Sequence, residues 1–138
     1  MWNAESYPRR GRVFSIITHH SSFISGIEAR SERMVNIPLA AYSGGKDFRD
    51  VVERYWLPAL DAFRPEMLFI SAGFDAHRDD DMAMLNLVEA DYAWVTEKIK
   101  AVAERTADGR IVSVLEGGYA LHALGRSVAT HLKVLGGL

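Results

Sequence analysis

The stretch MLFISAGFDAHRDDD, residues 67–81, decides the fold, because a nearly continuous apolar run leads directly into an acidic loop. An apolar run of this length without alternation is typical of a strand in a parallel sheet that is covered on both faces. A second run of the same kind follows at residues 110–115 (RIVSVL). The two runs predict neighbouring parallel strands.

A helix is predicted between these two strands. Asn86 and Glu89 have the three-residue spacing of a capping box at its start. The helix is expected to run to about Ala107 and to stop at Gly109, a residue type suited to helix ends. Strand, helix and strand in this order define a βαβ unit with a right-handed crossover. A closing helix is predicted over residues 120–135.

The upstream segment adds two short strands and a further helix. Residues 12–18 (RVFSIIT) and 34–39 (MVNIPL) are typical of strands. Apolar residues recur with helical period over residues 47–63, and Pro58 inside this pattern is expected to kink the helix. We therefore predict a single α/β unit over residues 1–138, a parallel sheet with flanking helices.

Composition excludes some classes of function. The chain has 138 residues, a formal net charge of -2 and no cysteine. This charge gives no electrostatic reason to bind nucleic acid or an anionic membrane surface. Absence of cysteine removes disulfides and thiolate zinc clusters and fits a reducing compartment, so we expect a cytoplasmic protein. No apolar run reaches the roughly 20 residues that a membrane-spanning helix needs.

Two loops leave the carboxyl ends of the predicted strands, where parallel sheets bind their ligands. Asp75 lies in the first loop and Tyr119 in the second, so both are expected at one edge of the sheet. From position alone, Asp75 suits a metal ligand and a turn cap equally well. Tyr119 could donate to an oxyanion, although packing against a helix explains its position better. Gly117 and Gly118 could cradle a phosphate, but EGGY matches neither common phosphate motif.

Taken as whole strings, the two loops resemble a known family. ISAGFDAHRDDDMAMLNL (residues 70–87) and VSVLEGGYALHALGRSV (residues 112–128) are similar to the C-terminal motifs of the histone deacetylase and acetylpolyamine amidohydrolase superfamily. The class II and bacterial members look closest, and the resemblance covers roughly residues 13–138. It implies an arginase-like α/β sheet and zinc-dependent hydrolysis of an acyl-lysine or acyl-polyamine amide.

The resemblance also assigns roles to single residues. Asp75 matches the zinc-ligating Asp of the family's GFDAH motif. Tyr119 matches the Tyr that polarises the acyl carbonyl and stabilises the oxyanion. Gly117 and Gly118 match the glycines that let this Tyr approach the metal. The positions that match the substrate tunnel are Phe23, Gly73 and Met82.

The family site is expected to be incomplete in this sequence. A catalytic zinc needs about three protein ligands, and the family takes two from an Asp-x-His motif and its general base from a His-His pair. We find neither motif, because His19 and His20 align outside the catalytic pair. His77 forms an Asp-x-His pattern with Asp75, but the family's His at this place is not a ligand. We therefore expect this sequence to be the C-terminal portion of a deacetylase domain without its N-terminal portion. The isolated chain is expected to be inactive. Zn2+ is expected in the complete family site and not necessarily in this chain by itself.

Several expectations about partners follow. The acidic run at residues 79–81 is most simply a solvated loop, although it could attract a cationic substrate. The resemblance implies an acylated lysine or polyamine as substrate. A partial sheet leaves an exposed edge or a bare apolar face, so we expect a homo-oligomer or a complex with the missing N-terminal half. The alternative function is a non-catalytic α/β fragment that acts as an oligomerising or interaction module.

Overall fold

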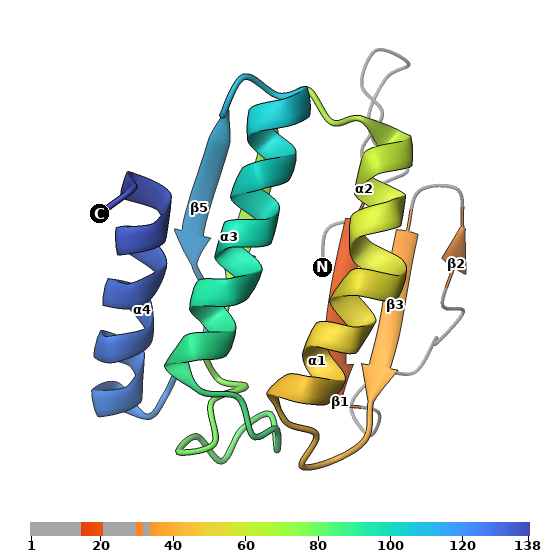
Figure 1. Cartoon of the computed structure of the whole chain (residues 1–138). Coiled ribbons are helices and arrows are strands. Elements are labelled where there is room, and N and C mark those ends of the chain that lie inside the picture. The colour runs from red at the N-terminus through yellow and green to blue at the C-terminus, as the bar shows by residue number, and fades with distance from the viewer. Residues whose placement is uncertain (1–14, 21–29, 32–33) are drawn as a thin grey trace.

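The computed structural model describes residues 15–20, 30–31 and 34–138, and these form strands with helices packed against them (Figure 1). The elements in chain order are the strands β1 (Ser15–His20), β2 (Arg30–Ser31) and β3 (Met34–Leu39), the helical segments α1 (Gly45–Val51), η2 (Val52–Trp56) and α2 (Leu57–Phe63), β4 (Leu68–Ala72), α3 (Glu89–Thr106), β5 (Ile111–Leu115) and α4 (Leu121–Gly136).

The predicted βαβ unit is confirmed. Strands β4 and β5 pair in parallel from Leu68 opposite Ile111 to Ala72 opposite Leu115, with α3 between them in the chain. Strand β1 pairs in parallel with β3, while the short β2 is antiparallel to β3. Within the described residues these strands form two separate sheets, ordered β1-β3-β2 and β4-β5. The α/β class is therefore correct, although no strand in the described ranges joins the two sheets by hydrogen bonds.

The helix predicted over residues 47–63 is present and is interrupted before Pro58. After α1, the segment η2 widens to π-helical bonding, and the Leu57 N–H reaches back to the Val52 carbonyl. Proline has no N–H to donate and its ring crowds the preceding turn, so a wider turn at this point accommodates it. The helix ends where Arg64 adopts a left-handed conformation with φ of 53°.

The start of α3 corrects one prediction. Its first helical residue is Glu89, and the carboxylate that caps it belongs to Asp91, which accepts the Val88 N–H at 3.0 Å. Asn86 instead donates its side-chain amide to the Tyr42 carbonyl at 2.9 Å. Asp91 also accepts two bonds from Arg49 of α1, at 3.0 and 2.9 Å. The cap therefore lies two residues later because an acid at this position also ties α3 to α1.

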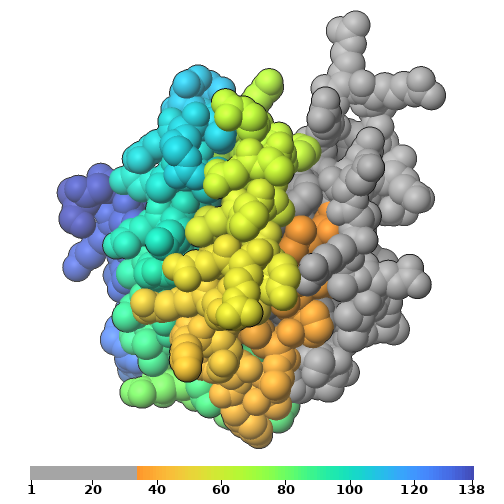
Figure 2. Space-filling model, turned by 45° about the vertical axis from the view of Figure 1, so that its right-hand side comes forward, coloured from red at the N-terminus to blue at the C-terminus, as the bar shows by residue number. Residues whose placement is uncertain are grey.

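The helices form one layer over the strands. Helices α1 and α2 lie beside α3 on this surface (Figure 2), and α3 packs against α4. The core between helices and strands includes Phe48 and Val52 on the α1 side and Val102 on α3. In the described part of the chain, no helix is both long and apolar enough to cross a membrane.

The opposite face of the β4–β5 pair is bare. Phe69 has 74% of its surface exposed and lies opposite Val112, and the next exposed pair on this face is Ser71 with Val114. The prediction that both faces of these strands are covered is therefore wrong for this chain. The reason is that all the described helices that contact this pair lie on its other face, against Leu68 and Ala72.

Candidate active-site edge

The two loops predicted to share an edge start side by side. The Glu116 N–H donates to the Ala72 carbonyl at 3.0 Å and the Phe74 N–H to the Gly117 carbonyl at 3.2 Å, which extends the β4–β5 pairing by one step. Gly73 permits this close approach, because a Cβ there would lie 2.8 Å from the Glu116 carbonyl oxygen. The parallel pairing thus confirms that the Asp75 and Tyr119 loops leave the same edge of the sheet.

The Asp75 carboxylate is half-buried and faces the second loop. A Cβ on Gly117 would lie 3.5 Å from its Cγ. Burial raises the pKa of Asp75, and the nearby charges of Asp80 and Glu116 raise it further, against backbone N–H donors that lower it. No ion pair to Asp75 is formed by any cationic side chain in the described part of the chain. A half-buried carboxylate among other carboxylates is the electrostatic setting that a cation stabilises.

The paired glycines shape the second loop. Gly117 and Gly118 have φ of +80° and +121°, values that residues with a Cβ rarely adopt. At Gly118 a Cβ would also lie 2.7 Å from Leu124 Cδ1 and 3.2 Å from Phe74 Cβ. These two glycines therefore allow the chain to pass between the Asp75 loop and α4, and to deliver Tyr119 beyond them.

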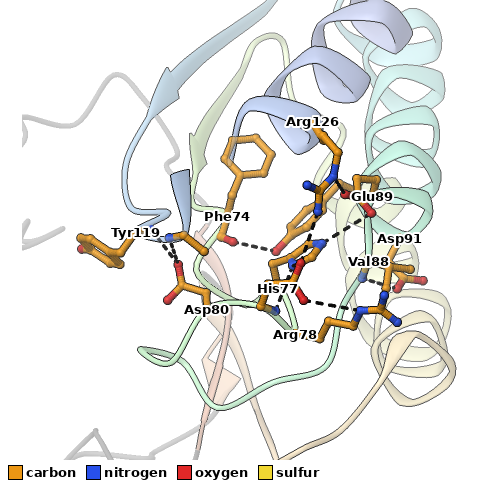
Figure 3. A network of polar contacts seen from close by, with 12 residues as sticks. Phe74, His77, Arg78, Asp80, Val88, Glu89, Asp91, Tyr119 and Arg126 are labelled. Atoms are coloured by element: carbon orange, nitrogen blue, oxygen red, sulfur yellow. Dashed lines mark hydrogen bonds and ion pairs between the residues drawn. The ribbon is translucent and has the colours of Figure 1, made fainter. Parts of the chain in front are cut away.

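The Tyr119 side chain is 62% exposed and points away from the loop that holds its backbone (Figure 3). The prediction that it packs on a neighbouring helix therefore has little support. Met82, predicted to line a substrate tunnel, is also exposed. Phe23, which the resemblance also assigns to the tunnel, lies outside the described residues.

His77 is buried, with 1% of its surface exposed, and its contacts are structural. Its Nδ1 accepts the Asp79 N–H at 3.1 Å, and its Nε2 lies 3.5 Å from a Glu89 carboxylate oxygen. The ring stacks parallel to Tyr92 with centroids 6.5 Å apart. Its Nδ1 is therefore engaged by the Asp79 N–H, whereas its buried Nε2 makes no hydrogen bond within the described part of the chain.

Glu89 connects this histidine to α4. It bonds to the Arg126 guanidinium, which also pairs with Asp79 at 3.2 Å. The bond from Arg126 lowers the pKa of Glu89 to about 2, helped by its own backbone N–H and by His77. The first turn of α3 is therefore tied to α4 and to the acidic loop through one charged cluster (Figure 3).

One residue at this edge was missed by sequence reasoning. Asp80 is 5% exposed, whereas its neighbours Asp79 and Asp81 are exposed, so the solvated interpretation is wrong for Asp80. Its carboxylate accepts the backbone N–H groups of Tyr119 and Ala120, at 2.6 and 2.9 Å. These partners are 39 and 40 residues away, so no local pattern could have revealed them.

Among the described residues, no group of three or more His, Cys, Asp or Glu side chains is placed to hold a metal ion. Within the described residues, Asp75 contributes one half-buried carboxylate with which no cationic side chain forms an ion pair.

Comparisons with known proteins define the class. The family model of the histone deacetylase domain matches residues 1–135. The chain therefore belongs to the histone deacetylase family, as the two loop motifs predict.

Individual relatives agree with this membership. Type-2 histone deacetylase 2 of Dictyostelium discoideum is 39% identical over 132 residues, which cover 94% of this chain and 7% of that protein. A histone deacetylase-like amidohydrolase of Pseudomonas aeruginosa is 35% identical over 122 residues, 82% of this chain and 32% of that protein.

Solved structures show the same fold. The crystal structure of the HDA15 HD domain matches with a TM-score of 0.76 and 26% identity, over 91% of this chain and 38% of that one. The histone deacetylase Clr3 matches with a TM-score of 0.70 and 32% identity, over 78% of this chain and 18% of that one. The chain thus spans less than half the length of each of these four proteins.

Proposed function

We propose that this chain carries the oxyanion-stabilising side of a zinc-dependent deacetylase site that hydrolyses acyl-lysine or acyl-polyamine amides. The observation that supports this most directly is the approach of two loops at one sheet edge. There Gly117 lies against the Asp75 carboxylate and Tyr119 follows two residues later. This arrangement matches the order of the family's GFDAH and EGGY motifs.

In this proposal Asp75 would hold the zinc ion together with ligands from elsewhere. The zinc would supply Lewis acidity toward the acyl carbonyl and lower the pKa of bound water. The Tyr119 hydroxyl would donate a hydrogen bond to the oxygen on which negative charge develops. Loss of one such donor from comparable sites costs roughly 3–4 kcal/mol of transition-state stabilisation. Phe23, Gly73 and Met82 would line the route of the acyl chain.

The rest of the site would come from a second segment of polypeptide. A catalytic zinc takes about three protein ligands, and Asp75 supplies one, so an Asp-x-His segment and a His pair are still required. The bare face at Phe69, Val112 and Val114 is the surface on which such a segment, or a second copy of the chain, would pack. A cytoplasmic setting is part of the proposal and rests on composition alone.

A second candidate is a non-catalytic interaction module. The bare apolar face favours it, because an exposed patch of Phe and Val on a paired strand surface promotes association whether or not a site is completed. In that case Asp75 and Tyr119 would have no substrate.

Reconstitution separates the two candidates. The chain would be mixed with a polypeptide that carries the family's His pair and Asp-x-His motif, and zinc content and acetyl-lysine peptide hydrolysis would be measured. We expect zinc binding and hydrolysis in the mixture only. Asp75→Ala should reduce the bound zinc, whereas Tyr119→Phe should keep the zinc and lose at least about 100-fold in kcat.

Two results would count against the proposal. If the purified chain alone bound one zinc ion and hydrolysed the peptide, the claim of an incomplete site would be wrong. If the two polypeptides formed a stable complex without any hydrolysis, the interaction module would be the better description.

A further inference from the structure

We propose that Asp80 is the residue that positions Tyr119. The inference deepens the function proposed above, since it concerns the residue assigned there as oxyanion donor. One carboxylate oxygen of Asp80 accepts the N–H groups of Tyr119 at 2.6 Å and Ala120 at 2.9 Å. The other oxygen accepts the N–H of Met82 at 3.0 Å. A single side chain thus joins the β4–α3 loop to the turn that carries Tyr119 (Figure 3).

Burial of this carboxylate requires such partners. An ionised carboxylate that is removed from water is strongly unfavourable unless hydrogen bonds or charges compensate it. Three backbone donors supply that compensation here. Burial raises the pKa of Asp80, but these donors together with His77 outweigh it, so the pKa lies below its usual value. The side chain therefore accepts these bonds as a charged group, which makes them stronger than bonds to a neutral acceptor.

The Tyr119 turn has few other constraints. Its ring is exposed, so packing does not fix its direction. The two residues before it are the glycines with positive φ, whose backbone has wide conformational freedom. Ala120, the residue before α4, has no side chain that could cap the helix. Two backbone bonds flank the turn, from the Phe74 N–H to the Gly117 carbonyl and from the Leu124 N–H to the Ala120 carbonyl. The bonds to Asp80 are the side-chain contacts that hold the Tyr119 and Ala120 N–H groups between them.

Asp80 is itself held in place within the β4–α3 loop. The Asp80 N–H donates to the His77 carbonyl at 2.9 Å, and His77 is buried against Tyr92 of α3. Asp80 and His77 thus connect the turn that carries Tyr119 to α3. A shift of this turn by about 1 Å is enough to cost a large factor in rate, because the donor must meet the oxyanion at hydrogen-bond distance.

The contact is tested by nuclear magnetic resonance of the chain. Backbone amide shifts of Met82, Tyr119 and Ala120 would be followed against pH. We expect all three to titrate together with one midpoint below 3.8, the usual carboxyl value. Asp80→Asn should abolish this shared titration and move the ring resonances of Tyr119. The matched control is Asp108→Asn, an exposed acid paired with Arg110 at the opposite edge of the sheet, which should leave all three amides unchanged.

The role in catalysis is tested in the reconstituted enzyme. We expect Asp80→Asn to lower kcat roughly tenfold or more with little change in KM, and to have no further effect in a Tyr119→Phe background. Equal losses in the wild-type and Tyr119→Phe backgrounds would show a general structural effect and overturn the inference. So would amides that fail to titrate together in the wild-type chain, a measurement that needs no variant to fold. An inactive reconstituted wild type would contradict the proposed function, while the amide titration would still decide whether Asp80 holds the turn.

Discussion

The Tyr92 hydroxyl of α3 donates a hydrogen bond of 3.1 Å to the carbonyl oxygen of Phe74, the residue before Asp75. Both side chains are buried, and their rings lie with centroids 5.0 Å apart. The third ring of this cluster belongs to His77, which stacks on Tyr92. A helix thus fixes the first turn of the loop that bears the proposed zinc ligand, through one polar bond and two ring contacts.

Tyr92→Phe should destabilise the fold by about 1–2 kcal/mol, because it leaves the buried Phe74 carbonyl without its donor. Burial and the nearby acids raise the pKa of Tyr92, so the hydroxyl keeps its proton and the loss should not vary with pH in the neutral range. Urea denaturation of the two proteins measures it. Tyr42→Phe, at an exposed position, should change the free energy of unfolding by less than about 0.5 kcal/mol.

Gly118→Ala should destabilise the fold by roughly 1–3 kcal/mol. The new Cβ would lie 2.7 Å from Leu124 Cδ1 on a backbone with φ of +121°. Gly125→Ala provides the matched control, since it lies within α4 and nothing is within 4 Å of its added Cβ. That change should stabilise the chain by about 0.5–1 kcal/mol, because alanine favours a helix interior. Thermal unfolding should move in opposite directions for the two variants, and shifts of the same sign would contradict this account of Gly118.

The parts that sequence predicted well are those with local causes. The apolar runs at β4 and β5 gave their parallel pairing, and Pro58 marked the break between η2 and α2. The errors have non-local causes. The capping acid of α3 is Asp91 and not the predicted Glu89, and Asp91 also binds Arg49 of α1, 42 residues away.

The candidate site at the edge of the sheet shows the same contrast between features with local causes and features with non-local causes. Strand ends and two family motifs were enough to place the Asp75 and Tyr119 loops together. Asp80 could not be distinguished from Asp79 and Asp81, because three consecutive acids have no periodic signal and only folding buries one of them. The bare face of β4 was also hidden, since an apolar run does not reveal which neighbours are present to cover it.

His131 should make stability depend on pH. Thr96 donates its hydroxyl to the Tyr92 carbonyl at 2.6 Å, so it can accept from His131 Nδ1 at 2.8 Å, which leaves Nε2 to accept from Ser113 at 2.9 Å. This geometry fits a neutral ring, and burial lowers the pKa of His131 below 6.5. Below that pH the unfolded chain binds a proton that the folded chain does not, so stability falls as pH falls from 6.5 toward the folded-state pKa.

The variant His131→Gln should remove this part of the pH dependence. Free energies of unfolding would be measured by urea denaturation between about pH 7 and pH 5. We expect a smaller slope with pH in His131→Gln than in wild type. His122→Gln, at an exposed position of the same helix, should keep the wild-type slope. Equal slopes in wild type and His131→Gln would show that another group causes the pH dependence.

Phe69→Ser should weaken association of the chain without unfolding it. Phe69 is already 74% exposed, so its removal should change the free energy of unfolding by less than about 1 kcal/mol. Its neighbour Leu68 faces the helices and is buried, and Leu68→Ala should cost about 2–5 kcal/mol. The two adjacent positions therefore separate the role of the bare face from that of the core.

Light scattering across a dilution series measures the association. A Phe side chain that becomes buried contributes about 1.5–3 kcal/mol, so its loss should weaken self-association by roughly tenfold or more. Val112→Ser, on the paired strand opposite Phe69, should act in the same direction because the two side chains share one face. A wild-type chain that stays monomeric at high concentration would remove the second copy as occupant of this face. The polypeptide that completes the proposed zinc site would then be the occupant to test, and Phe69→Ser should weaken its binding.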